Sequence, residues 1–212
     1  MLFWLALLAA HALVAQDSGR SPAPRNFVHH VQGQVLLNGV AIDDTAPDPR
    51  NPRFPELGKD SVLRTELGLA EVMLAPGVVL RMGESSGIRA TGPAHISLEA
   101  GAIVVEAADT KRGHVTVHAG GRTVAVIRPG IYRIGESGTS DALLRWTERR
   151  SRSLSMASAS SAWMLREDRR AWKSPDWLWN PYFGMFSYVP SKGQACNQWG
   201  HCYYAPDSVF RR

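Results

Sequence analysis

Residues 70–82 read AEVMLAPGVVLRM, and this stretch decides the fold class of the chain. Apolar side chains recur at every second position on both sides of the Ala75-Pro76-Gly77 turn, with Glu71 and Arg81 among the residues between them. Alternation with a period of two is typical of strands that bury one face, and Pro-Gly is a turn signal. The stretch therefore predicts a β-hairpin with one buried face.

The same pattern continues on both sides of this hairpin. Short apolar runs alternate with Gly, Pro, Asn and Asp throughout residues 31–136, with turn signals at Asn38-Gly39 and Gly120-Gly121. Residues 43–55 contain four prolines and three aspartates, and we expect an exposed loop there because proline cannot donate to a β ladder. Many short strands separated by closely spaced turns predict a mainly β fold, a β-sandwich or jelly-roll-type domain.

The pattern changes in residues 140–173, where no Gly or Pro interrupts the chain. Asp141 is expected to cap a helix, and the segment predicts one or two helices. The whole formal net charge of +5 lies within residues 142–173, where eight basic residues stand against three acidic ones. A solvated helix face is the ordinary interpretation of such a segment, and contact with an anionic partner is the alternative.

The tail, residues 174–212, contains prolines, glycines and many aromatic side chains. The prolines and glycines exclude a long helix, so we expect an irregular segment that docks on another surface. One interpretation is that the rings pack over an open face of the β-domain. The other is that they remain exposed and stack on sugar rings or anchor a protein contact.

The first fifteen residues carry no charged side chain, and a polar lead, residues 16–30, follows them. As a helix, residues 1–15 would span about 22 Å, which is shorter than the ~30 Å hydrocarbon core of a bilayer. An export signal fits this length better than a membrane span, and an uncleaved anchor is the alternative. We therefore expect an exported protein, periplasmic or envelope-associated, with a flexible lead and no stable transmembrane span.

The two cysteines, Cys196 and Cys202, lie six residues apart. In an oxidising compartment they can close a small disulfide loop, and two free thiols are the alternative. His201 suggests zinc, but a structural zinc site needs four ligands and no fourth His or Cys lies nearby in the sequence. We expect no metal and no cofactor.

The other candidate groups do not form a recognisable catalytic set. His114 and His118 would lie about 13 Å apart on a strand, too far to share a zinc ion, and His29-His30 has no third ligand. Neither a Gly-x-Ser-x-Gly nor a Gly-x₄-Gly-Lys-Ser/Thr motif is present. The sequence therefore does not predict an enzyme.

Several blocks of the β-domain resemble the FecR domain, and they occur in the same order. The blocks are residues 31–35 VQGQV, 57–65 LGKDSVLRT, 68–74 GLAEVML, 76–82 PGVVLRM, 98–104 LEAGAIV and 123–126 TVAV. The resemblance covers about half of the chain and departs from the family at Arg128-Pro129-Gly130, where many members have Arg-Gly-Thr. It implies an extracytoplasmic β-domain whose relatives sense or scaffold by protein contact, and the segment that regulates a sigma factor in membrane-bound members is not expected here.

These observations lead to two functional hypotheses. The first is a non-catalytic, extracytoplasmic FecR-like protein that acts by protein contact as an envelope scaffold or sensor, with another envelope protein as its partner. The second is a cell-wall or polysaccharide-binding module, for example on peptidoglycan. Nucleic acid is not an expected partner of an exported chain. The predicted contact surface of the second hypothesis consists of Trp177, Trp179, Tyr182, Phe186, Arg169 and Arg170.

Overall fold

The predicted hairpin forms two adjacent strands of the sheet, β3 (Val62–Ala75) and β4 (Val78–Met82). The computed structural model describes residues 26–43, 54–111, 113–135, 138–166 and 176–209. The fold is mainly β, as predicted, with a single α-helix among the described residues. The other elements are β1 (Phe27–Leu37), β2 (Val40–Ala41), β5 (Ser86–Gly92), β6 (His95–Ala100), β7 (Ala102–Ala107), β8 (Val115–Ala119), β9 (Arg122–Val126), β10 (Gly130–Gly135), α1 (Asp141–Met164), β11 (Asp176–Asn180), β12 (Met185–Val189), β13 (Gln194–Cys196) and β14 (Cys202–Tyr204).

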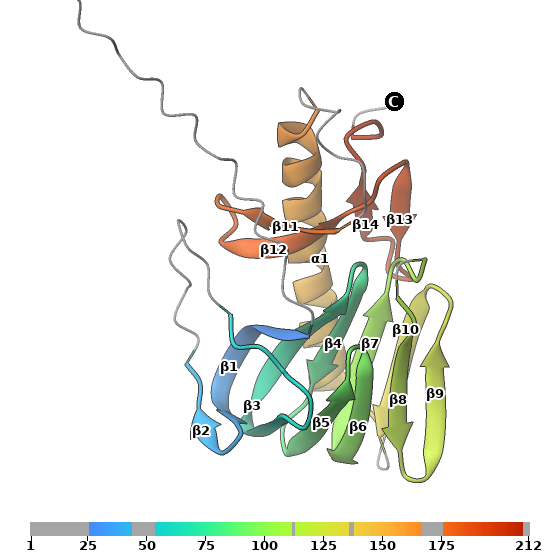
Figure 1. The fold of residues 1–212 in the computed structure, drawn as a ribbon. Coiled ribbons are helices and arrows are strands. Elements are labelled where there is room, and N and C mark those ends of the chain that lie inside the picture. The colour runs from blue at the N-terminus through green and yellow to red at the C-terminus, as the bar shows by residue number, and fades with distance from the viewer. Residues whose placement is uncertain (1–25, 44–53, 112, 136–137, 167–175, 210–212) are drawn as a thin grey trace, which may run out of the picture.

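Ten strands form one curved sheet in the order β10-β7-β4-β3-β5-β6-β8-β9, with β1 paired to β3 and β2 paired to β1 (Figure 1). The long strand β3 belongs to both layers of this sheet, because residues 70–75 pair with β4 and residues 62–65 pair with β5. Strand β1 follows β3 along both halves. The sheet therefore turns a corner within β1 and β3 and encloses an apolar core, which we call the barrel.

Two glycines permit this corner. Gly33 has a φ of +73°, and a Cβ at this position would collide with the carbonyl oxygen of Leu67. A Cβ at Gly68 would lie 2.6 Å from the carbonyl oxygen of Gln32. Only hydrogen fits in either place, so the two backbones approach each other where the sheet bends.

The apolar residues that recur at every second position of the hairpin face the barrel interior, as predicted. Val72, Leu74 and Leu80 are at most 1% exposed and belong to the main apolar cluster. The prediction that only one face of the hairpin is buried is wrong, because Glu71 and Arg81 on the other face are also completely buried. The outer face of β3 and β4 is covered by the part of the chain that follows the barrel.

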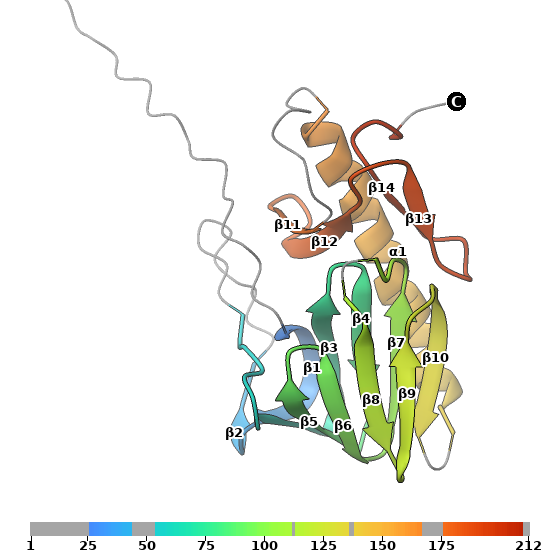
Figure 2. The same cartoon turned by 45° about the vertical axis from the view of Figure 1, so that its right-hand side comes forward.

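The barrel is open on one side. Strands β9 and β10 follow each other in the chain, yet β9 pairs with β8 and β10 pairs with β7, and no ladder joins β9 to β10. Figure 2 brings this side of the barrel forward. We call the gap between β9 and β10 the seam.

Helix α1 runs along the outside of the barrel and continues beyond its end, where β11–β12 and β13–β14 pack beside it (Figures 1 and 2). Ser140, and not the predicted Asp141, caps the helix, because the Ser140 hydroxyl accepts a hydrogen bond from the N–H of Leu143. Asp141 occupies the first turn. Small residues of α1 allow close packing on the tail. The hydroxyl of Ser158 donates to the carbonyl of Tyr188 at 2.7 Å.

The structure corrects two predicted boundaries. Strand β1 begins at Phe27, so residues 27–30 belong to the barrel and not to a flexible lead, because Phe27 is buried in an apolar cluster with Met73 and Phe186. The tail is not irregular, since it contains two antiparallel hairpins, β11–β12 and β13–β14. The predicted export signal, residues 1–15, lies outside the described residues, as do the last residues of the predicted helical segment.

Candidate functional site

A buried cluster of charged side chains lies between the barrel and the elements that cover it. Its centre is Arg81 on β4, whose Nε donates to Glu71 Oε2 at 2.8 Å and whose Nη1 donates to Glu106 Oε2 at 2.7 Å. The three residues stand on the adjacent strands β3, β4 and β7, so the ladder itself brings them together. Their side chains are at most 1% exposed.

Helix α1 adds the second cation of the cluster. The Nη2 atom of Arg150 donates to Glu71 Oε1 at 2.7 Å, and the hydroxyl of Ser151 donates to Glu106 Oε1 at 2.9 Å. Two carboxylates therefore face two guanidinium groups, and the formal charges balance. The prediction of a solvated helix face is wrong for Arg150, which the helix turns inward, while Arg145, Arg149 and Arg152 are exposed as predicted.

The tail completes the cluster from the other side. The side-chain amide of Asn197 donates to Glu106 Oε1 at 2.7 Å, and the hydroxyl of Tyr203 donates to the same oxygen at 3.0 Å. The predicted disulfide between Cys196 and Cys202 is present and closes the loop that carries Asn197. Barrel, helix and tail therefore meet at two carboxylates.

His29 links the cluster to β12. Its Nδ1 lies 2.9 Å from Glu71 Oε1, and its Nε2 accepts a hydrogen bond from the backbone N–H of Phe186 at 2.9 Å. A carboxylate at Nδ1 and a donor at Nε2 require the neutral ring with its proton on Nδ1. Burial accordingly lowers the pKa of His29 below its ordinary value of 6.5, against the opposing effect of Glu71.

The cluster also shifts the pKa of Glu71 and the pKa of Tyr203. Burial alone would raise the pKa of Glu71, but the Arg150 and Arg81 guanidinium groups outweigh it and hold that pKa well below its ordinary value. Burial raises the pKa of Tyr203 well above its ordinary value, and the charge of Glu106 raises it further. Glu71 is therefore ionised and Tyr203 neutral at physiological pH. All four carboxylate oxygens accept hydrogen bonds, so these groups hold the parts of the chain together.

We expect the stability of the folded chain to fall on acidification, in two steps. The unfolded chain takes up a proton at His29 near pH 6.5 and the folded chain does not, so the free energy of unfolding decreases as the pH drops below 6.5. Below the ordinary Glu71 pKa of 4.5 the same argument applies to that carboxylate. Each group contributes a slope of at most about 1.4 kcal/mol per pH unit.

Urea denaturation at pH 7.5, 6.5 and 5.5 measures the first step. His29→Gln can still donate to Glu71 and accept from Phe186 but does not titrate, so the variant should lose that part of the slope. His118→Gln is the matched control, because His118 is exposed. Equal slopes for the three proteins would contradict the assignment to His29.

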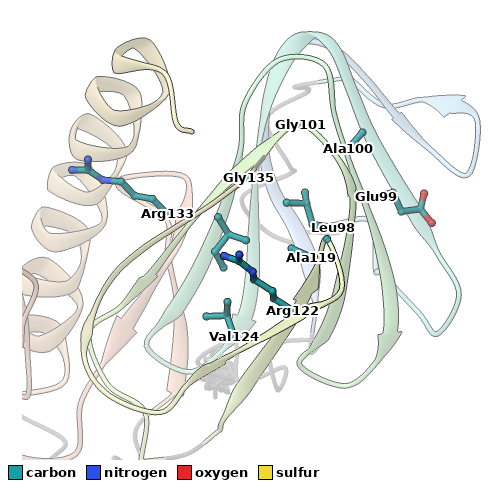
Figure 3. Close-up of a pocket in the computed structure, with 11 residues that line it drawn as sticks. Leu98, Glu99, Ala100, Gly101, Ala119, Arg122, Val124, Arg133 and Gly135 are labelled. Carbon is teal, nitrogen blue, oxygen red and sulfur yellow. The ribbon is translucent and has the colours of Figure 1, made fainter. Parts of the chain in front are cut away.

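The seam contains a cavity of about 450 Å³. Leu98, Ala119, Val124 and Ile134 supply its apolar walls, and glycines of the strand ends form part of its rim. Figure 3 shows Leu98, Val124 and Arg122 turned toward this space. Its volume lies in the range of sites that accept a small molecule or the side chains of a bound peptide.

One positive charge faces this cavity. Arg122 is turned toward it, whereas Arg133 points toward α1 and Glu99 points outward (Figure 3). Glu99 is already held by Arg89, whose Nε donates to it at 2.6 Å. Within the described part of the chain, Arg122 forms no ion pair. The cavity thus combines apolar side chains with polar lining atoms, and it has one unneutralised guanidinium at its edge.

The rings of the predicted aromatic surface do not form one surface. Trp177 and Phe186 are 6% and 5% exposed and pack in the apolar cluster on the outer face of the barrel. Trp179 is half-buried, and Tyr182 is 81% exposed at the turn between β11 and β12. Arg169 and Arg170, which complete the predicted surface, lie outside the described residues.

The histidine predictions are confirmed in part. His114 and His118 are exposed, as predicted. The prediction that His29 belongs to a flexible lead is wrong, because its ring is buried against Glu71. The sequence signal that points to the cluster is the placement of Glu71 and Arg81 in otherwise apolar strands, opposite each other across a predicted turn.

Neither a metal centre nor a membrane-spanning helix is found in the described part of the chain. Within the described ranges, no group of three or more His, Cys, Asp or Glu side chains is arranged to hold a metal ion. Likewise, no helix of the described residues has both the length and the hydropathy to cross a bilayer. Comparison of the chain with known protein families, with curated proteins and with solved structures found no match.

Proposed function

We propose that the chain is a non-catalytic, extracytoplasmic FecR-like protein that acts by protein contact, as an envelope scaffold or sensor. The order of the sequence blocks in residues 31–134 supports the family assignment. The disulfide between Cys196 and Cys202 supports an oxidising compartment, where such bonds persist.

The open seam carries the proposal. Most sheets cover, twist or close their edges, because an exposed edge is a template for another chain. In this barrel the edges of β9 and β10 both border a cavity and no ladder connects them. The charged cluster ties the helix and the tail to the outer face of β3, β4 and β7, so that part of the barrel is supported, while no ladder closes the seam.

The polysaccharide-binding alternative has less support. Two of its four aromatic side chains, Trp177 and Phe186, are used for packing between the tail and the barrel. Tyr182 is the most exposed ring of the set, and a single exposed ring gives a small stacking platform. Tyr182 is therefore the residue on which this alternative can be tested.

Two parallel assays separate the alternatives. The purified, oxidised protein is incubated with detergent-solubilised envelope extract for cross-linking and mass spectrometry, and with purified peptidoglycan for sedimentation. We expect one envelope protein to be recovered, with the reverse capture recovering this chain, and no sedimentation above an unrelated basic protein. Sedimentation that Tyr182→Ala abolishes would support the alternative, and binding in neither assay would contradict both functions.

A further inference from the structure

We propose that the seam binds an extended segment of the partner protein, which adds to the free edge of β9 and brings a carboxylate to Arg122. This inference rests on the proposed function, since it requires a protein partner. This inference adds to the proposed function the place of contact on this chain and the chemistry of the partner segment.

The free edge of β9 offers backbone hydrogen-bonding groups. Strands β8 and β9 are joined by the two residues Gly120-Gly121, so Ala119 and Arg122 form the hydrogen-bonded pair that closes the hairpin. Hydrogen-bonded and non-hydrogen-bonded pairs alternate along an antiparallel ladder. The N–H and C=O groups of Thr123 and Ala125 therefore point away from β8, into the seam, where an extended chain can pair with them.

Side-chain alternation directs part of any added segment into the cavity. Val124 and Val126 face the barrel interior, with Val126 buried and Val124 half-buried, whereas Thr123 and Ala125 are exposed on the other face. A segment paired with β9 has the same alternation, so every second side chain enters the space beside Leu98. An apolar side chain at such a position would contact the apolar walls of the cavity.

The charge of Arg122 selects among such segments. An inward-pointing charge on an edge strand prevents unselective pairing, because an added apolar strand would bury that charge without a counterion. Arg122 has this orientation and no ion-pair partner among the described residues (Figure 3). A segment that presents a carboxylate removes the penalty by forming a charge-assisted hydrogen bond. The recognised pattern is therefore an apolar residue and an acidic residue separated by one position.

A second copy of this edge does not have that chemistry. Strand β9 reads RTVAV and β10 reads GIYRIG, so neither contains an acidic residue. Pairing two copies through these strands would leave each Arg122 without a carboxylate partner. A partner with an acidic, alternating segment fits the seam better.

Two blocked peptides test the proposal directly, because the direction of the added strand is not specified. They are Thr-Thr-Val-Thr-Glu-Thr-Thr and Thr-Thr-Glu-Thr-Val-Thr-Thr. Titration is followed by NMR of backbone amides, and we expect one of the peptides to shift the amides of Thr123 and Ala125. Replacing its Glu by Gln should weaken binding at least about tenfold. The two threonines that flank Glu have their N–H groups on the edge of the peptide that pairs with β9. N-methylation of one of these threonines should abolish binding.

Variants of the chain complete the test. Arg122→Glu should reverse the preference, so that the peptide with Lys in place of its Glu binds better than the original peptide. Ala125→Pro removes an edge N–H without removing a ladder donor, and it should abolish binding while its thermal unfolding shows that the barrel still folds. Arg133→Glu is the matched control, because Arg133 points away from the cavity, and it should leave binding unchanged.

Other results would overturn the proposal. Absence of shifts at Thr123 and Ala125 with both peptides would contradict strand addition, and equal shifts with acetate alone would assign the cavity to small anions. An envelope partner that still binds Arg122→Glu and Ala125→Pro would place the contact elsewhere. In that case this inference fails while the proposed protein-contact function stands.

Discussion

Replacing Glu71 by Gln should lower the free energy of unfolding by about 3–5 kcal/mol, because it breaks a buried ion pair and leaves a guanidinium without its counterion. Glu71 accepts hydrogen bonds from Arg81 and Arg150, and both lose a charged partner in this variant. The amide also cannot accept from His29 and Arg81 with the strength of a carboxylate. For a chain of this size, such a loss corresponds to a decrease in melting temperature of roughly 10 °C.

Glu99→Gln is the matched control for Glu71→Gln. Glu99 also pairs with an arginine at short distance, but its side chain is 27% exposed and that of Arg89 is 40% exposed. An exposed pair contributes about 0–1 kcal/mol, so this variant should change the melting temperature only slightly. The double variant Glu71→Gln/Arg81→Met should be less destabilised than the sum of its single variants. Additive effects, or equal effects of Glu71→Gln and Glu99→Gln, would contradict the cluster as described.

Gly33→Ala should be the second strongly destabilising change, and comparison with Gly39→Ala separates its two causes. Both glycines have positive φ, +73° and +82°, so both alanines have the same conformational cost of roughly 1–2 kcal/mol. At Gly39 a Cβ meets nothing within 4 Å, whereas at Gly33 it would collide with the Leu67 carbonyl. Gly33→Ala should therefore cost at least about 2 kcal/mol more than Gly39→Ala, since the collision involves backbone that cannot move without opening the corner.

Urea denaturation of both alanine variants measures this difference. Circular dichroism of the folded proteins should show that each retains its strands. Equal losses for the two variants would mean that β1 and β3 can separate at the corner without cost. The close approach of the two backbones would then not explain the bend between the two layers.

Features set by neighbouring residues could be predicted from the sequence. The hairpin at β3–β4 depends on strand alternation and a Pro-Gly turn, and the disulfide depends on two cysteines six residues apart. The mainly β class follows from many such local signals. No distant part of the chain is needed to make these predictions, and the structure confirms them.

The charged cluster depends on distant parts of the chain, so the local pattern marks Glu71 and Arg81 as unusual but does not predict the groups that surround them. His29 is 42 residues from Glu71, and Arg150 is 79 residues from it. In a strand with one buried face, Glu71 and Arg81 occupy the positions that normally face water. Only the docking of α1 and the tail on that face shows why charged side chains are buried there.

The seam is also outside the reach of local patterns. Strands β9 and β10 are separated by residues 127–129, a spacing that ordinarily indicates a hairpin. Strand β10 instead pairs with β7 and packs on α1, where Ile131 contacts the cluster of Leu143 and Trp146. The position of β10 is thus set by β7 and by a helix that follows β10 in the chain.

We propose that this protein contacts its partner through the seam. Photo-cross-linking in the producing cells tests it most directly, with a photoreactive residue at Thr123 in one strain and at Met156, an exposed residue of α1, in another. We predict a discrete protein adduct from Thr123 that disappears in Arg122→Glu, and no adduct from Met156. Adducts from Met156 alone, or an adduct from Thr123 that Arg122→Glu leaves unchanged, would contradict contact through the seam.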